Sequence, residues 1–155
     1  MLDLIKRHLA ALSATNWDEY KASLAPDAVY EEHASMQRAK GADAYLKVIQ
    51  AWKRGFPDLE AHFLDGFASG NKVFAEVEWE GTHTGPFKGP FGELAPTNKR
   101  GTVKAALIFT ITDGKISECH HYFDILTILR QMGVAPMATP PGPAAKAAPP
   151  ARPKH

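Results

Sequence analysis

The sequence has only one cysteine in 155 residues, Cys119, so it holds no intramolecular disulfide framework. It also lacks any apolar run near the roughly 18 residues that a transmembrane helix needs. Charged residues begin at Asp3, which leaves no uninterrupted apolar stretch for a secretory signal peptide. Together these absences lead us to expect a cytoplasmic protein without a membrane partner.

The sequence also lacks an excess of charge of either sign. The 18 Lys and Arg residues nearly balance 17 Asp and Glu residues, and basic residues gather only in pairs such as Lys6-Arg7 and Lys99-Arg100. Binding to phosphate backbones needs clustered cations. We therefore expect no nucleic-acid partner.

Several catalytic motifs are absent as well. No serine lies in a Gly-x-Ser-x-Gly turn, and no glycine-rich phosphate loop occurs. Cys119 has no adjacent cation on its expected strand face, so it fits a small buried side chain better than a thiolate nucleophile. No His-x-His or His-x-x-x-His pair occurs, and the adjacent His120 and His121 point to opposite faces of a strand, so we expect no metal site.

Hydrophobic periodicity is the strongest positive signal. Apolar residues recur at three- and four-residue spacing in the first third of the chain, which predicts helices over 2–12, 17–24 and 41–53. A short strand over 28–33 follows the break at Pro26. The period then changes to two, which predicts strands over 59–68, 72–82, 102–112 and 115–123.

A short closing helix begins at Ile125 and stops at Gly133. Helices followed by a run of strands predict an α+β fold: a curved antiparallel sheet packed on N-terminal helices, with a short C-terminal helix. We place this domain at residues 1–134. Residues 135–155 are rich in Pro and Ala and are expected to form a disordered tail.

Asp124, at the end of the last predicted strand, is the first candidate for chemistry. Strand alternation places it on one face with His120 and Tyr122. A carboxylate facing an apolar pocket would have a raised pKa suited to proton transfer. Alternatively, Asp124 caps the closing helix at Ile125. The sequence leaves both interpretations open.

Two further histidines are candidate pocket residues, and each also has a purely structural interpretation. His33, on the first strand, is either a pocket residue or a structural donor, and His83, in a Gly- and Pro-rich loop, lines a pocket mouth or binds nearby backbone. Most aromatic side chains are expected in the core, and some are expected to line a cavity for a flat apolar ligand. The candidates for such a lining are Trp17, Trp52, Phe56 and Trp79.

Seven segments, in this order, resemble the SnoaL-like polyketide cyclases. They are Asn16-Trp17-Asp18, Leu24-Ala25-Pro26-Asp27-Ala28-Val29, Phe56-Pro57-Asp58-Leu59, Gly81-Thr82-His83-Thr84-Gly85-Pro86-Phe87, Asp113-Gly114-Lys115-Ile116, and Tyr122-Phe123-Asp124 with Leu129-Arg130-Gln131-Met132-Gly133. The resemblance spans residues 5 to 134. It implies the cone-shaped α+β barrel of the nuclear transport factor 2-like superfamily and a pocket akin to that of ketosteroid isomerase.

The resemblance also implies an activity. Such enzymes close a ring of an aromatic polyketide ester by intramolecular aldol chemistry, without metal or organic cofactor. Asp124 then matches the acid/base aspartate, and His33 matches a histidine that positions the substrate, with His83, His120 and Tyr122 nearby. The expected partners are a small hydrophobic or aromatic molecule and further copies of the chain, in a homodimer or homotetramer.

The chain departs from the family at the pocket rim. The turn Leu94–Gly101 differs from the Pro-Pro-Thr-Gly turn of many relatives, and His120 stands where many have tryptophan. Because fold does not fix function, two other functions stay open. One is an isomerase or hydrolase of a small hydrophobic molecule, and the other is a non-catalytic ligand-binding module.

Overall fold

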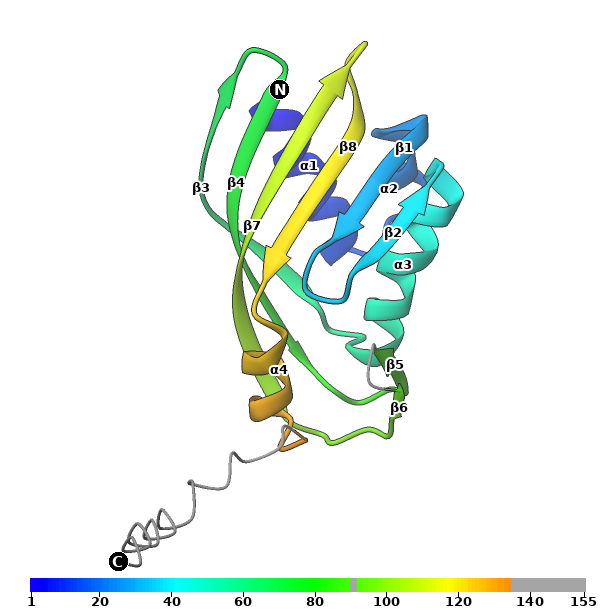
Figure 1. Ribbon diagram of the computed structural model, residues 1–155, viewed down its shortest axis with the longest axis vertical. Coiled ribbons are helices and arrows are strands. Elements are labelled where there is room, and N and C mark those ends of the chain that lie inside the picture. Colours follow the sequence, from blue (N-terminus) through cyan, green and yellow to red (C-terminus); the bar gives the residue numbers. More distant parts are fainter. Residues whose placement is uncertain (90–91, 135–155) are drawn as a thin grey trace, which may run out of the picture.

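The computed structural model describes residues 1–89 and 92–134. It has the predicted α+β fold, with three N-terminal helices, a curved sheet and a short last helix (Figure 1). The elements are α1 (Leu2–Ser13), α2 (Trp17–Ala22), β1 (Leu24–Glu32), β2 (Gln37–Lys40), α3 (Ala42–Gly55), β3 (Glu60–Ser69), β4 (Lys72–Thr82), β5 (Phe87–Gly89), β6 (Gly92–Leu94), β7 (Arg100–Thr112), β8 (Lys115–Phe123) and α4 (Ile125–Gln131). The tail predicted for 135–155 lies outside the described residues.

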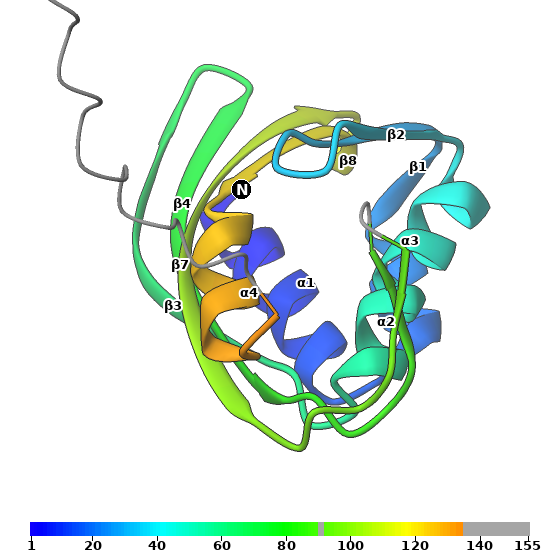
Figure 2. The ribbon, with the colours of Figure 1, turned by 60° about the horizontal axis from the view of Figure 1, so that its bottom comes forward.

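Six strands form the main sheet in the order β2-β1-β8-β7-β4-β3. The sheet curls around α1, with α2 and α3 beside it and α4 at one end (Figure 2). The strands pair antiparallel except β1 and β8, which run parallel. The N-terminal helices therefore fill the concave side of the sheet. Among the described residues, no helix has the length and apolar character needed to cross a membrane.

The structure differs from the predicted elements around Pro26. The second helix ends at Ala22, and β1 already begins at Leu24, so Pro26 lies within a strand. The register with β8 shifts between Leu24 and Val29. Proline cannot donate to a ladder and is tolerated in strands mainly at edges and bulges, which explains why this irregularity lies there.

Three short strands were not predicted. β2 follows a turn in which Met36 has a φ of 56°, and β5 and β6 form a separate small hairpin. Their three or four residues are too few to show a period of two. Only their pairing partners in the folded chain identify them as strands.

The core lies between α1, α3 and the concave face of the sheet. Ile5, Val73 and Val77 are fully buried, as the helical and alternating patterns predict. Cys119 is also fully buried, and burial raises the pKa of its thiol to about 12. The prediction of a small buried side chain, rather than a nucleophile, is confirmed by this environment.

Lys53 is a buried cation that joins three elements. Its Nζ donates to the carbonyl oxygens of Leu59 at 2.9 Å, Ser13 at 3.1 Å and Pro57 at 3.3 Å. These carbonyls belong to the end of α1 and the segment that leads into β3. Burial lowers the pKa of Lys53, while the nearby carboxylates of Asp58 and Glu60 act in the opposite direction.

Replacing Lys53 should therefore destabilise the fold. We expect Lys53→Met, which keeps the apolar stem but removes three donors, to lower the free energy of unfolding by about 1–3 kcal/mol in urea titrations. Lys47→Met, on the exposed side of the same helix, should change it by less than about 0.5 kcal/mol. Equal effects of the two substitutions would contradict this role of Lys53.

Candidate functional site

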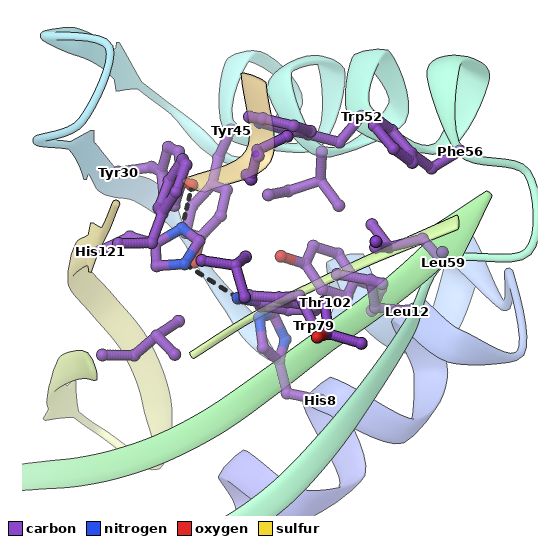
Figure 3. A pocket seen from close by; sticks show the side chains of 18 of the residues that line it. His8, Leu12, Tyr30, Tyr45, Trp52, Phe56, Leu59, Trp79, Thr102 and His121 are labelled. Atoms are coloured by element: carbon purple, nitrogen blue, oxygen red, sulfur yellow. Dashed lines mark hydrogen bonds between the residues drawn. The ribbon is translucent and has the colours of Figure 1, made fainter. Parts of the chain in front are cut away.

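A pocket lies between α1, α3 and the concave face of the sheet (Figure 3), and Ile128 and Gln131 of α4 line one part of it. Its volume is about 70 Å³, well above the roughly 10–15 Å³ that one water needs. Most of its lining is aromatic or aliphatic. The residues shown by label are His8, Leu12, Tyr30, Tyr45, Trp52, Phe56, Leu59, Trp79, Thr102 and His121.

His121 is the central polar group of this pocket. It lies on β8 and is held on both ring nitrogens: Nδ1 lies 2.7 Å from the Tyr30 hydroxyl, and Nε2 accepts from the Trp79 indole N–H at 3.0 Å. Figure 3 shows both contacts as dashed lines. The imidazole is thus fixed between β1 and β4, with its edge toward the pocket.

The donors in this network fix its protonation. An indole N–H can only donate, so His121 Nε2 carries no proton, and in the neutral ring Nδ1 does. Nδ1–H then donates to the Tyr30 oxygen, and the Tyr30 hydroxyl donates to Glu32 Oε2 at 2.9 Å. A directed chain of hydrogen bonds therefore runs from Trp79 through His121 and Tyr30 to Glu32.

Glu32 ends this chain as a buried carboxyl group with three donors around it. Besides Tyr30, the Trp52 indole N–H donates to Oε2 at 2.8 Å and the Ser35 hydroxyl to Oε1 at 2.5 Å. Only 1 % of Glu32 is exposed. A buried carboxylate is tolerated when its oxygens accept hydrogen bonds, and these three donors meet that requirement.

A second buried imidazole, His8, lines the same pocket. The Ser23 hydroxyl donates to the Tyr20 carbonyl at 2.6 Å, so it accepts from His8 Nδ1 at 2.6 Å. The ring also stacks on Tyr20 with centroids 3.9 Å apart.

Both imidazoles are neutral in the folded protein. Burial lowers the pKa of His8 to about 3 and that of His121 to about 3, and the neighbouring His33 acts in the same direction on His121. A free histidine has a pKa of about 6.5. The unfolded chain therefore binds protons on these residues below that pH while the folded chain does not, and stability falls as the pH decreases from 6.5 toward 3.

Histidine NMR tests this assignment. We expect the Cε1–H resonances of His8 and His121 to stay at their neutral positions between pH 8 and pH 5, because their pKa values lie below this range. His121→Gln should identify one resonance and make the unfolding midpoint less dependent on pH. A resonance of His121 that titrates near pH 6.5 would contradict the network.

Comparison with known proteins identifies the family. The model for "SnoaL-like polyketide cyclase" matches residues 2–132, which is most of the chain. The chain belongs to the SnoaL-like polyketide cyclase family. None of the curated proteins matches it.

Solved structures share this fold. IdmH from Streptomyces antibioticus, a candidate polyketide cyclase, is 25% identical, with 85% of this chain and 97% of that chain covered and a TM-score of 0.73. A candidate SnoaL-like polyketide cyclase from Jannaschia sp. CCS1 is 21% identical, with 87% and 92% covered and a TM-score of 0.77. AclR from Streptomyces galilaeus, a candidate hydroxylase, is 20% identical, with 88% and 87% covered and a TM-score of 0.74.

In this SnoaL-like domain, Asp124 does not face the pocket, so the prediction of a pocket carboxylate with a raised pKa is wrong. Asp124 is exposed and caps α4: Oδ1 accepts from the Leu126 N–H at 2.9 Å and Oδ2 from the Thr127 hydroxyl at 2.7 Å. The hydrogen bond from Thr127 lowers the pKa of Asp124, opposed in part by desolvation. The structural alternative, a helix cap, describes this residue.

A cap has a distinct signature. Asp124→Ala should lower the unfolding midpoint more than Asp124→Asn, because asparagine also caps helices. The advantage of Asp over Asn should be present at neutral pH and lost as the pH falls through about 4 toward the lowered pKa of the folded state. Thermal unfolding between pH 7 and pH 3 measures both effects. Identical midpoints for all three proteins would contradict the cap.

Among the aromatic candidates, Trp52, Phe56 and Trp79 line the pocket as predicted. Trp17 does not: it packs against the outside of the core, edge-on to Tyr20. His83 is buried but lies outside the pocket lining, stacked on Phe56 with its Nδ1 3.1 Å from the Thr97 hydroxyl. Its expected place at a pocket mouth is therefore wrong.

His33, His120 and Tyr122 lie on the opposite, outer face of the sheet, so their predicted place in the pocket is wrong. The cause is the assignment of strand faces. Cys119, His121 and Phe123 share the inner face of β8, and alternation then turns His120 and Tyr122 outward. Phe123 contacts the Trp52 ring edge-on at 5.7 Å.

The sequence interpretation missed His121, Tyr30 and Glu32 as site residues. One signal was present: Cys119 was expected to be buried, and His121 has the same parity on the strand. Tyr30 and Glu32 share the inner face of β1 in the same way, and only 1 % of each residue is exposed. Their pairing with β8, however, depends on a parallel contact between distant segments.

Proposed function

We propose that this domain is a cofactor-independent cyclase that closes a ring of a polyketide-type ester in the apolar pocket, with His121 as the acid/base group. The observation that carries the proposal is the neutral imidazole of His121, buried in an aromatic pocket and hydrogen-bonded through Tyr30 to Glu32. Family membership and the candidate cyclases among its structural relatives support the reaction class.

The reaction needs a base in its first step. His121 Nε2, which holds the free lone pair of the neutral ring, takes a proton from a carbon between two carbonyl groups of the substrate. The resulting enolate carbon attacks a second carbonyl carbon of the same molecule, and a carbon–carbon bond forms. The proton on Nε2 then passes to the new alkoxide, so His121 returns to its neutral form.

Tyr30 and Glu32 support this cycle from the other side of the ring. While Nε2 carries the substrate proton, the ring is an imidazolium, and its Nδ1–H still donates to Tyr30. Tyr30 in turn donates to Glu32, so a carboxylate lies one hydroxyl away from the positive charge. A carboxylate so close to the ring, in a site of low dielectric, stabilises the imidazolium during turnover.

Trp79 controls access to the base. Its indole N–H donates to Nε2, and the substrate takes its place at this atom. The remaining walls, including Trp52 and Phe56, hold a flexible apolar chain in a folded conformation, which contributes to rate through proximity. The ligand class that fits this lining is a small hydrophobic or aromatic molecule with few polar groups.

Paired substitutions test the assignment. A panel of aromatic polyketide esters, steroids and terpenoids is first screened by thermal shift, and a responsive ester is followed for turnover. We expect His121→Gln to lower kcat at least about 100-fold, since it removes the base. Asp124→Asn, the matched control, should stay within about twofold because Asn retains the cap.

Tyr30→Phe provides a further variant in the same network. It keeps the ring that stacks on Tyr45 at 4.7 Å but removes the hydroxyl between His121 and Glu32, so kcat should fall while KM changes little. Circular dichroism checks that each variant is folded. Full turnover by His121→Gln, or loss of turnover in Asp124→Asn, would refute the proposal.

A further inference from the structure

A second cluster of titratable side chains lies on the outer face of the sheet, away from the pocket. Glu31 and His120 are direct partners in the parallel pairing of β1 with β8. His33 comes two residues after Glu31 and thus faces the same side, and its backbone N–H donates to the His121 carbonyl at 3.0 Å. Regular backbone pairing therefore brings two imidazoles and a carboxylate together.

Three donor atoms of this cluster converge. His33 Nε2 lies 3.1 Å from His120 Nδ1, His120 Nδ1 lies 3.3 Å from Glu31 Oε2, and His33 Nε2 lies 3.9 Å from the same oxygen. In a tetrahedral zinc site with bonds of about 2.0–2.1 Å, neighbouring ligand atoms are about 3.3–3.4 Å apart. The observed separations span that value, so one ion can be reached by all three atoms with small side-chain rotations.

The surroundings orient these donors. Glu118 Oε1 lies 3.4 Å from His120 Nε2, so a proton on Nε2 would face this carboxylate and leave the lone pair of Nδ1, the atom that faces the cluster, for a metal ion. Arg38 Nε donates to Glu31 Oε1 at 2.8 Å, which turns Oε2 toward the histidines. A carboxylate behind a histidine and a donor behind a carboxylate are typical of outer shells around metal ligands.

His33 is held as well. Its ring stacks on Tyr122, with centroids 4.2 Å apart and planes 3° from parallel. The side chains of Glu31, His33 and His120 are 27%, 39% and 25% exposed, so an ion can reach them from solvent. Tyr122 thus holds the His33 ring on the outer face and does not contribute to the pocket.

We propose that Glu31, His33 and His120 form a binding site for one divalent transition-metal ion of the Zn²⁺ class. Two imidazoles and one carboxylate are ligands that Zn²⁺ accepts, with water in the fourth position. The site lies on the face of β8 opposite His121. None of its three proposed ligands lines the pocket, and a metal-free reaction in the pocket is compatible with a metal on the outside.

Calorimetric titration of the untagged full chain with Zn²⁺ tests the site. We expect one equivalent to bind, His33→Ala and His120→Ala each to weaken the affinity at least about 100-fold, and Glu118→Gln to weaken it about tenfold by removing the outer carboxylate. Titration with Co²⁺ should produce the visible absorption of a tetrahedral site and lose it in His33→Ala.

His62→Ala is the matched control, because His62 is also a partly exposed histidine beside two carboxylates, at 3.0 Å from Glu80 and 3.8 Å from Glu60. It should leave the affinity unchanged. Absence of saturable 1:1 binding, or equal weakening by His62→Ala and His120→Ala, would overturn the proposal. Circular dichroism checks that each variant is folded. His33→Ala is the variant expected to disturb the fold least, because His33 has the most exposed side chain of the three proposed ligands.

Discussion

The parallel pairing of β1 with β8 is the constraint on which both sites of this protein depend. It places Glu32 beside His121 and Glu31 beside His120, and strand alternation sends the two pairs to opposite faces of the sheet. One register thus builds the inner hydrogen-bond chain and the outer cluster at once. A shift of one residue in that register would exchange the two sets and bury the wrong charges.

Burial gives the same residue types different chemistry on the two faces. Inside, the imidazoles of His8 and His121 lose their proton affinity, and Glu32 depends on three donors. Outside, Glu31 and Glu118 remain in contact with solvent and with the cations Arg38 and Lys72. Groups on the outer face therefore stay accessible to solvent, whereas inner groups are held in a fixed network.

Much of this architecture could be predicted from the sequence, because helices, long strands and the Asp113-Gly114 turn have local signals. Three of the four predicted lining aromatics, Trp52, Phe56 and Trp79, do line the pocket. The error concerned orientation: Asp124, His120 and Tyr122 were assigned to the inner face, although the expected burial of Cys119 indicated the other parity. The contact of β1 with β8 joins residues about ninety positions apart, and no local pattern encodes it. The network of Tyr30, Glu32 and His121 could therefore not be predicted from the sequence.

The seven residues of α4 are too few to form a stable helix alone. The Asp124 cap stabilises the first turn of α4, and Gln131 attaches the helix to β7, because its side-chain amide exchanges two hydrogen bonds of 2.9 Å with the backbone of Thr102. Gln131 and Met132 also line the pocket. Detachment of this one short segment would therefore open a route to the interior without disturbing the sheet, and the local unfolding equilibrium of α4 sets an upper limit on how often a molecule can enter that way.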